Sequence, residues 1–375
     1  NIEKKLRAFD LLGFSLSYEL GATNILEILD LEVPEPGPGE ARVKVSVSGV
    51  NPSDWKARRN GRGGGMGFEM IIPHSDGSGT VDAVGEGVES SLIGEKVWTV
   101  NAQYKRPFGT AAQYVVLPKN YVFKLPKEAS FEEGACFGIP FLTAYRALTV
   151  DGDISGQNIL IQGGAGSVGH HLIQIAKWLG AKVLTSVSSE EKERYVLEAG
   201  ADEVFNYRDT KFVENILSST NGVGVDRIIE VDVASNIKTY DQILKPKGAA
   251  IIYGTSQPIA QVPGFSFIVR EAKLTWFIVY ELNDEQRTQG TMFLDEMLSS
   301  SKNPIILNGA GVVLSEGAID ASKALAERLL KEGEATDGQR LEKIFSLTLT
   351  RKPTKQEQAI LLELLAEQRK RYEED

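Results

Sequence analysis

The sequence predicts an α/β protein of two domains, in which a strand-rich part precedes a parallel sheet covered by helices. Its 375 residues are 42% hydrophobic and 25% charged, which suits about two globular domains with sizeable cores. Short strand patterns separated by turns fill residues 6 to about 130. From Phe131 onward, helix and strand signals alternate, as they do in βαβ units.

The strand-rich part contains several segments with period-2 patterns or short apolar runs. Polar and apolar residues alternate over 41–50, directly after a turn rich in proline and glycine. Further short strands are expected within 79–88, at 95–100 and at 112–117. A glycine-rich run at 61–67 has neither a strand before it nor a helix pattern after it. We interpret that run as a surface loop rather than a second phosphate-binding loop.

The second part alternates between strand and helix patterns. Strands are expected at 159–161, 182–187, 202–205, 225–231 and 249–253, with helices after Gly169, from Glu190 and from Phe212. Such units connect through right-handed crossovers, so the strands should form one parallel sheet.

A glycine-rich turn between a strand and a helix indicates a dinucleotide site. Gly164, Gly166 and Gly169 have the G-x-G-x-x-G spacing. The first glycine allows a tight turn, the second lets backbone approach a pyrophosphate, and the third lets helix and strand pack closely. We therefore expect residues 164–168 to bind the cofactor, namely Gly164, Ala165, Gly166, Ser167 and Val168. The alternative is a purely structural β–α turn.

Composition excludes several classes of protein. The net charge of −10 argues against a broad nucleic-acid surface, and no apolar run is long enough to cross a bilayer. The chain begins with polar residues rather than a secretory signal. The single cysteine, Cys136, excludes an internal disulfide framework and fits a reducing cytoplasm. We expect a cytoplasmic protein with no nucleic-acid or membrane partner.

Several ordered motifs extend along the chain. They lie at 32–40, 49–56, 72–79, 138–145, 200–202, 206–209 and 244–248. Together they resemble zinc-independent medium-chain dehydrogenase/reductases, in particular NADPH:quinone reductases. The resemblance covers residues 6 to about 313, and His74 replaces a glycine that is usual in the third motif.

The resemblance implies a domain organisation. It implies a GroES-like, β-barrel-like catalytic domain over 6–130 and a Rossmann NADP-binding domain over 131–283. The chain is then expected to return to the catalytic domain over 284–334 and to end in a helical tail of unknown role over 335–375. Relatives are often dimers through the edge of the Rossmann sheet, so a homodimer is expected by resemblance.

Zinc members of this superfamily need a cysteine, a histidine–glutamate pair and a further ligand. Asn51 stands in place of the cysteine, and Ser75 and Asp76 stand in place of the pair. An amide and a hydroxyl are poor zinc ligands beside a thiolate and an imidazole. The adjacent His170 and His171 cannot chelate one ion in the usual i, i+4 manner. We expect no bound metal.

The end of the second Rossmann strand indicates the cofactor. An NAD site usually places a carboxylate there, whereas this strand ends in Ser188 and Ser189. Hydroxyls and an ammonium suit a 2′-phosphate. The resemblance assigns this role to Ser189, Lys192 and Tyr207, which favours NADPH. Alternatively, Ser188 forms a capping box with Glu191, and Glu190 remains able to meet a ribose.

The remaining candidate residues would contact the reacting end of the cofactor. Asn51 can orient a substrate carbonyl or the nicotinamide ribose, and Lys56 either stabilises negative charge on a reduced oxygen or is a solvated helix residue. The resemblance adds Thr143, Gly254, Thr255, Phe277 and Val279 as cofactor contacts. For each, a structural role is the alternative.

Three functions follow from these candidates. The first is metal-free hydride transfer from NADPH to a quinone or a related conjugated carbonyl acceptor. The second is an enoyl or alkenal reductase, which the same residues would serve. The third is a non-catalytic dinucleotide-binding protein with a structural or regulatory role, because no convincing acid–base pair is evident.

The C-terminal part departs from the family pattern. Related chains end in a helix and a short strand that returns to the catalytic domain, and here 312–316 resembles only the approach to it. Helices are instead expected at 318–330, 341–349 and 355–371. The last of these has an apolar stripe, which would serve a partner or a second copy, or would pack on its own chain.

Overall fold

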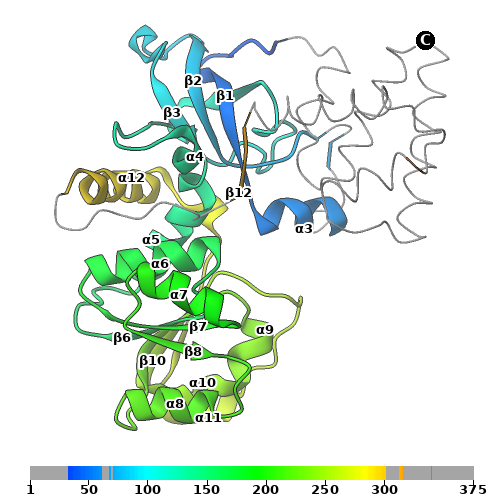
Figure 1. Cartoon of the computed structure of the whole chain (residues 1–375). Helices are drawn as coiled ribbons and strands as arrows, with labels where there is room; N and C mark the ends of the chain where they lie inside the picture. Colours follow the sequence, from blue (N-terminus) through cyan, green and yellow to red (C-terminus); the bar gives the residue numbers. More distant parts are fainter. Residues whose placement is uncertain (1–32, 61–66, 69–70, 301–311, 316–338, 340–375) are drawn as a thin grey trace. The chain divides into compact units, whose positions relative to one another are not determined.

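The computed structural model describes residues 33–60, 67–68, 71–300, 312–315 and 339 (Figure 1). The chain divides into two compact units: residues 1–125 with 312–375 form unit 1, and residues 126–311 form unit 2. The glycine run at 61–66 and the helices expected at 318–330, 341–349 and 355–371 lie outside the described residues.

Unit 1 is built on a six-stranded antiparallel sheet. Its strands are β1 (Glu40–Val50), β2 (Gly77–Val84), β3 (Lys96–Thr99), β4 (Tyr114–Pro118), β5 (Val122–Lys124) and β12 (Val312–Ser315), with α3 (Pro52–Asn60) after β1 and short turns η1 (Ser90–Leu92) and η2 (Lys119–Tyr121). The order is β12-β1-β2-β3-β5, with β4 also paired to β1. All four strands expected in this part are confirmed, although the second ends at Val84.

Strand β1 organises unit 1. One of its edges pairs with β4 near Ala41 and with β12 near Val50, while its other edge pairs with β2 through two register shifts. Such bulges increase the local twist, so the sheet curls as a barrel-like fold requires. The predicted alternation in β1 is confirmed, because Ala41, Val43, Val45 and Val47 are buried and pack with residues of the neighbouring strands.

Unit 2 is built on a six-stranded parallel sheet. Its strands are β6 (Asn158–Ile161), β7 (Lys182–Val187), β8 (Glu203–Asn206), β9 (Val225–Glu230), β10 (Leu244–Ile252) and β11 (Lys273–Trp276). Their order is β11-β10-β9-β6-β7-β8. Strands β7 and β8 thus lie on one side of β6, and the later strands β9, β10 and β11 lie on the other side. This is the doubly wound arrangement, whose switch point lies where β6 and β9 meet. The expected βαβ pattern is confirmed.

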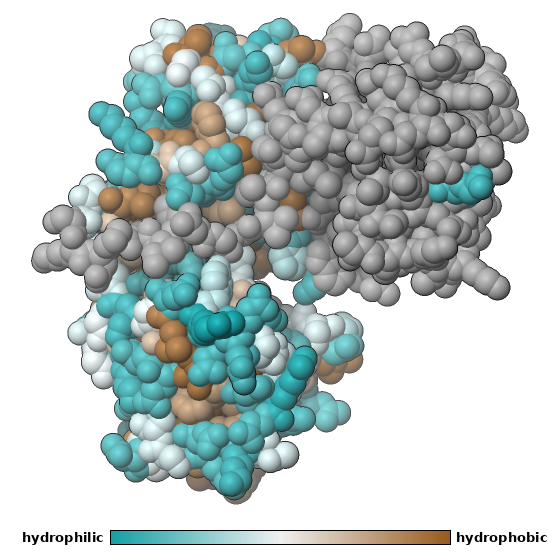
Figure 2. Space-filling model, in the orientation of Figure 1, coloured by the Kyte–Doolittle hydropathy of each residue, from teal (hydrophilic) through white to brown (hydrophobic). Residues whose placement is uncertain are grey.

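Unit 2 contains the three predicted helices, which follow residues 164–166 or begin at Glu190 and Phe212, together with others that precede the sheet or follow its later strands. They are α4 (Phe131–Gly134), α5 (Leu142–Thr149), α6 (Ser167–Trp178), α7 (Glu190–Glu198), α8 (Phe212–Ser219), α9 (Val233–Asn236), α10 (Tyr240–Ile243), α11 (Gly264–Arg270) and α12 (Asp284–Ser299), with short turns η3 (Phe137–Phe141), η4 (Ile237–Thr239) and η5 (Val279–Glu281). On the face shown in Figure 2, the surface of unit 2 is largely hydrophilic with smaller hydrophobic areas.

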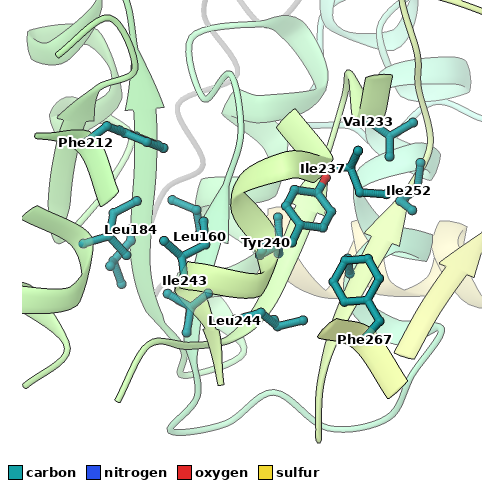
Figure 3. Packing of buried hydrophobic residues seen from close by; sticks show 14 residues of the cluster. Leu160, Leu184, Phe212, Val233, Ile237, Tyr240, Ile243, Leu244, Ile252 and Phe267 are labelled. Atoms are coloured by element: carbon teal, nitrogen blue, oxygen red, sulfur yellow. The ribbon is translucent and has the colours of Figure 1, made fainter. Parts of the chain in front are cut away.

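The core of unit 2 lies between the sheet and the helices that follow β8, β9 and β10. Leu160, Leu184, Ile228 and Ala250 come from four neighbouring strands and are fully buried. Figure 3 shows how Tyr240 and Phe267, with other members of this cluster, pack beside the strands. This packing holds the carboxyl ends of β6, β7, β9 and β10 in fixed relation to one another.

Unit 2 extends further along the sequence than expected. Helix α12 belongs to unit 2, where an added Cβ at Gly290 would lie 2.6 Å from the Leu142 side chain. Tyr145 and Phe293 also face each other across α5 and α12, with ring centroids 5.0 Å apart. The division therefore falls at Val312, whereas the sequence placed it at 284, because α12 packs against α5 through Gly290 and Phe293.

A strand that the sequence analysis did not identify completes the sheet of unit 1. Strand β12 pairs antiparallel with β1, so that Val312 lies opposite Val50 and Ser315 opposite Val47. Residues 312–315 are thus a strand of unit 1, and the expected loss of the family's final strand concerns residues outside those described. The pairing joins residues more than 250 positions apart, which no local pattern can indicate.

Candidate functional site

The glycine-rich turn after β6 can only be built from glycines at certain positions. An added Cβ at Gly164 would lie 2.1 Å from the Thr185 hydroxyl, and one at Gly169 would lie 2.4 Å from the Gly163 carbonyl oxygen. The N–H of Gly163 donates to the Ser186 hydroxyl at 3.1 Å, which ties the turn to β7. Strand, turn and helix are therefore packed as closely as a dinucleotide site requires.

Gly166 is less confined than its neighbours. It is exposed, with φ −79° and ψ 165°, and an added Cβ would meet one atom, the Gly163 carbonyl oxygen, at a tight 3.3 Å. It is also the N-cap of α6, and it has no side chain with which to occupy the N–H groups of the first helical turn. Those groups and the helix dipole can receive an anion. Ala165, Ser167 and Val168 belong to the same turn.

The end of β7 brings hydroxyl groups and one cation together. Lys192 Nζ donates to Ser188 Oγ at 3.2 Å, and the backbone N–H of Lys192 donates to Ser189 Oγ at 3.4 Å. Ser189 is therefore the N-cap of α7. The capping box considered for Ser188 and Glu191 is wrong, because Ser189 is the N-cap and the third residue of the helix is Lys192.

Tyr207 lies beside this strand end. Its backbone N–H donates to the carbonyl oxygen of Val187, the last residue of β7, at 3.1 Å. The phenol is 50% exposed, with the Arg208 guanidinium 5.9 Å from its ring centroid. The structure thus places two of the predicted phosphate contacts, Lys192 and Tyr207, at the same strand end.

The loops after β9 and β10 form the other side of the switch point. An added Cβ at Gly254 would lie 2.2 Å from the Val231 carbonyl oxygen, so the two loops touch through backbone. The carboxylate of Asp232 accepts a hydrogen bond from the Ser256 N–H at 2.7 Å, and the exposed Thr255 donates to the Gln257 carbonyl oxygen at 2.8 Å. Gly254 and Thr255 therefore lie beside the switch point, and the cofactor contact that the resemblance implies for them stays a prediction.

The other cofactor candidates of unit 2 lie on separate elements. Phe277 is half-buried directly after β11, and its N–H donates to the Ile252 carbonyl oxygen at 3.2 Å. Val279 is buried in η5, and Thr143 is buried in the first turn of α5. The order of the strands brings Phe277 next to the end of β10, whereas Thr143 belongs to a helix that precedes the sheet.

Unit 1 holds Asn51 in a buried polar cluster. Asn51 Nδ2 donates to Asp76 Oδ1 at 2.6 Å, and its backbone N–H donates to Asp54 Oδ2 at 2.8 Å. A carboxylate can only accept, so the amide nitrogen of Asn51 must face Asp76 and its Oδ1 points away as an acceptor. This orientation suits a hydroxyl donor such as a ribose better than a substrate carbonyl. Asp76 and Ser75 are fully buried.

A second chain of hydrogen bonds starts on the backbone of Asp76. Thr110 Oγ1 donates to the Asp76 carbonyl oxygen at 2.5 Å, and Ser48 Oγ lies 2.8 Å from both Thr110 Oγ1 and His74 Nδ1. Because the Thr110 hydrogen is already used, Ser48 donates to Thr110 and must accept from His74. The chain therefore selects the tautomer of His74 that carries its hydrogen on Nδ1.

His74 occupies an unfavourable backbone conformation. Its φ of 74° is in the left-handed region, which explains why glycine is usual here in the resembling family. The ring is 1% exposed, and burial lowers the pKa of His74 to about 4. A neutral imidazole that holds Ser48 compensates for the backbone strain.

Lys56 is exposed on α3, five residues after Asn51. The two tentative catalytic residues of the sequence analysis are thus on one connected segment of unit 1. Among the residues that the structure describes, no group of three or more His, Cys, Asp or Glu side chains could hold a metal ion. No helix within those residues is long and apolar enough to cross a membrane.

Comparison with known proteins agrees with this architecture. Residues 37–127 match the model of the alcohol dehydrogenase GroES-like domain, and residues 167–294 match the model named zinc-binding dehydrogenase. The quinone oxidoreductase of Pongo abelii is 31% identical over 277 residues, which cover 72% of this chain and 82% of the relative. That of Sus scrofa is 34% identical over 247 residues, covering 64% of this chain and 73% of the relative.

Solved structures share the same fold. Mycobacterial Rv1454c, complexed with NADPH, is 26% identical with a TM-score of 0.66, and the match covers 80% of this chain and 92% of that one. An NAD-dependent alcohol dehydrogenase is 27% identical with a TM-score of 0.65, and the match covers 81% of this chain and 91% of that one. The predicted fold class, a GroES-like unit with a Rossmann unit, is confirmed.

A GroES-like unit joined to a dinucleotide-binding unit defines an oxidoreductase that uses a nicotinamide cofactor. The chain belongs to the medium-chain dehydrogenase/reductase family, among its quinone reductase-like members. Sequence reasoning missed two residues at the switch point, Glu230 and Asp232. Their position directly after the apolar end of β9 was the available signal.

Proposed function

We propose that the protein transfers a hydride from NADPH to a quinone or a related conjugated carbonyl compound, without a metal ion. The observation that carries the choice of NADPH is the pair formed by Lys192 and Ser188 at the end of β7. A cation and hydroxyl donors there suit a 2′-phosphate, whereas NAD sites place a carboxylate at this position.

The cofactor would supply the hydride, and the protein would bind and orient it. In unit 2 the turn from Gly164 to Val168 would hold the pyrophosphate through backbone N–H groups. Ser188, Ser189, Lys192 and Tyr207 would hold the 2′-phosphate at the end of β7. Gly254, Thr255, Phe277, Val279 and Thr143 would contact the nicotinamide half, and Asn51 Oδ1 would accept from its ribose.

A metal-free reaction is supported by the residues of unit 1 that stand where zinc members of the superfamily have their metal ligands. Asn51 is engaged with Asp76 through its amide nitrogen, and Ser75 is fully buried. Neither is a good zinc ligand. The model named zinc-binding dehydrogenase matches residues 167–294, which do not include these positions.

The proposed acceptor is supported by the curated quinone oxidoreductases at 31–34% identity. Reduction of a quinone by two electrons yields a hydroquinone anion, which can take its proton from water. The protein therefore needs no dedicated acid, and the exposed Lys56 would at most stabilise the anion. The second candidate is an enal reductase, since a solved 2-haloacrylate reductase is 26% identical with a TM-score of 0.61.

One experiment separates these functions. The full chain is mixed with NADPH or NADH and with a quinone, an enal or no acceptor, and the loss of nicotinamide absorbance is followed. We expect turnover with NADPH and the quinone, and elemental analysis without stoichiometric zinc. Turnover with the enal alone would favour the second candidate. Tight NADPH binding without any turnover would favour a non-catalytic role, and one zinc per chain would contradict the metal-free reaction.

Replacing Lys192 by alanine is expected to weaken NADPH binding about ten- to hundredfold and to change NADH binding less than threefold. A charge-assisted hydrogen bond contributes about 1.5–3 kcal/mol, and NADH lacks the phosphate that receives it. Fluorescence titration with both cofactors measures the effect. The matched control is Arg194→Ala, which removes an exposed cation from the same helix. If NADPH and NADH binding were weakened equally, Lys192 would not contact the 2′-phosphate.

The homodimer expected by resemblance is supported by an apolar surface at the edge of the unit 2 sheet. Strand β11 is an edge strand, and exposed apolar side chains lie on and near it. They are Ile259, Val262, Phe265, Ile268, Val269, Trp276 and Ile278, and we name this set the edge patch. Phe265 is 80% exposed and Ile268 75%, which is unusual unless another surface covers them.

Placing glutamate at both Phe265 and Ile268 is therefore expected to convert a dimer into a monomer, as measured by light scattering. Two buried charges would face their own copies across a two-fold interface. Met292→Glu, on the exposed face of α12 at 66% exposure, serves as the control and should leave the mass unchanged. A wild-type protein that is already monomeric at micromolar concentration would contradict the dimer.

A further inference from the structure

Glu230 is a fully buried carboxylate at the carboxyl end of β9. It is 0% exposed and is held by three residues of the segment that follows. Its Oε1 accepts from the Asp232 N–H, and its Oε2 accepts from the Tyr240 hydroxyl at 2.6 Å. Asn236 Nδ2 donates to both oxygens, at 3.0 and 3.2 Å. The side chain therefore fixes the whole turn between β9 and α10.

The contacts of Glu230 suit its ionised form. The Asp232 N–H and Asn236 Nδ2 can only donate, and with the Tyr240 hydroxyl they direct four hydrogen bonds at the carboxylate. None of these partners in the described chain is a cation. Burial, and to a smaller extent the charge of Asp232, raise the pKa of Glu230, and the hydrogen bonds from Tyr240, Asp232 and Asn236 offset part of that rise. The result is a negative charge inside the protein that no positive group of its own network neutralises.

Asp232 adds a second carboxylate to the same turn. It accepts from the Ser256 N–H at 2.7 Å and from the Ser235 hydroxyl at 2.6 Å. These hydrogen bonds lower the pKa of Asp232, although its burial acts in the opposite direction. Because Ser256 follows the β10 strand end, both acids lie at the junction of the loops that include Val231 and Gly254.

The strand order identifies which half of a dinucleotide meets this junction. The glycine turn follows β6, and the phosphate candidates Ser188 and Lys192 follow β7, on one side of it. Strands β9 and β10 lie on the other side of β6. A dinucleotide that spans the switch point with its adenosine over β7 must place its nicotinamide half over β9 and β10.

We propose that Glu230 supplies a fixed negative charge that favours the oxidised, positively charged form of the nicotinamide ring over the reduced form. This inference rests on the proposed function. When the ring gives up a hydride, two electrons and one proton pass to the acceptor together, and the ring changes from neutral to a charge of +1. A nearby buried anion interacts with the cationic ring and not with the neutral one, which draws the cofactor toward hydride donation.

A purely structural role for Glu230 predicts something different. Loss of a structural clamp would weaken the binding of both cofactor forms to the same extent and would lower the melting temperature. Loss of a charge would weaken NADP⁺ alone. The ratio of the dissociation constants of NADP⁺ and NADPH therefore separates the two roles, and it can be measured at equilibrium without turnover.

The test compares Glu230→Gln with wild type by calorimetric titration of the full chain with NADP⁺ and with NADPH. We expect NADP⁺ to bind about tenfold more weakly to the variant, because charges in a protein interior interact far more strongly than in water. Binding of NADPH should change less than threefold. Equal weakening of both forms, or an unchanged ratio, would overturn the proposal.

Two controls and a second variant complete the test. Tyr240→Phe removes one hydrogen bond to Glu230 but keeps its charge, so its ratio should equal that of wild type. Glu203→Gln removes a carboxylate at the opposite end of the sheet, where it pairs with Lys182, and should also leave the ratio unchanged. If Glu230→Gln does not fold, Val231→Lys places a cation on the same turn at a 42% exposed position. It should shift the ratio in the same direction, and an unchanged ratio would contradict the proposal.

The proposed function and this inference fail in distinguishable ways. If wild type binds neither NADP⁺ nor NADPH, the proposed function is wrong. If wild type binds both and the variants leave the ratio unchanged, only the role of Glu230 is wrong.

Discussion

Gly166→Asp is expected to abolish dinucleotide binding while leaving the stability of unit 2 close to that of wild type. Gly166 is the N-cap of α6, its φ and ψ are open to any residue, and an added Cβ would have one close neighbour, the Gly163 carbonyl oxygen at a tight 3.3 Å. Aspartate is among the best N-cap residues, so it stabilises the helix through the same N–H groups that a pyrophosphate would use. The carboxylate would also repel the phosphates.

The expected loss is at least about 100-fold in the affinity for NADPH, because two or more charge-assisted hydrogen bonds of about 1.5–3 kcal/mol each are lost. Titration and thermal unfolding measure the two effects separately. Gly169→Ala is the matched control. Its Cβ would lie 2.4 Å from the Gly163 carbonyl oxygen, so it should lower the melting temperature. A Gly166→Asp protein that still binds NADPH would show that the phosphates bind elsewhere.

The second large effect is a loss of stability in mild acid. All three histidines of the chain are buried, at 1%, 1% and 2% exposure for His74, His170 and His171. Burial lowers the pKa of His74 and of His170 to about 4, and burial together with the charge of His170 lowers that of His171 to about 3. In the unfolded chain a histidine has a pKa of about 6.5.

The sign of the effect follows from these values. Below pH 6.5 the unfolded chain binds protons that the folded chain does not, so stability is full above pH 6.5 and falls as pH decreases toward 4. At pH 5 each histidine costs about 2 kcal/mol, so unit 1 with His74 loses about 2 kcal/mol and unit 2 with His170 and His171 about 4 kcal/mol, against about 5–15 kcal/mol for a domain. The raised pKa of Glu230 opposes this loss in part.

Denaturant unfolding at pH 7.5, 6 and 5 measures the effect, with His171→Leu as the informative variant. His171 Nε2 has no hydrogen-bond partner in the described chain, and the ring packs edge-on against Phe141 with centroids 5.7 Å apart. An apolar replacement should keep the packing. It should lower by about one the number of protons that the chain takes up on unfolding in mild acid, and so flatten the dependence of the unfolding free energy on pH. Stability that does not change between pH 7.5 and pH 5 would contradict the neutral, buried state of the three rings.

Local patterns predicted the parts of the fold that depend on neighbours in the sequence. The strand at 182–187 and the start of α7 at Glu190 lie where they were expected. The N-cap of α7 was misplaced by one residue, from Ser189 to Ser188, because two serines in succession are equivalent until the backbone is known. The glycine turn was predictable because Gly164 and Gly169 leave no room for a side chain against the adjacent strand and within the turn.

Long-range contacts could not be predicted in the same way. Strand β12 forms only because β1 offers an unpaired edge, and its four residues have no distinctive pattern of their own. Asn51 and Asp76 are 25 residues apart, and only their contact at 2.6 Å shows which face of the Asn51 amide remains for a ligand. Glu230 is an ordinary acidic residue in the sequence, and its burial depends on the packing of Tyr240 and Asn236.

The sequence by itself determined that this protein has a dinucleotide-binding unit, because Gly164, Gly166 and Gly169 have the spacing of a nucleotide-binding turn in which Gly164 and Gly169 admit no side chain. It also determined the family, through motifs spread over both units. Only the tertiary structure decided which polar groups face one another at the strand ends. Those contacts join Lys192 to Ser188 and Glu230 to Tyr240. They arise from the order in which the strands pair, and burial then sets the charge of each group and its effect on a bound ring.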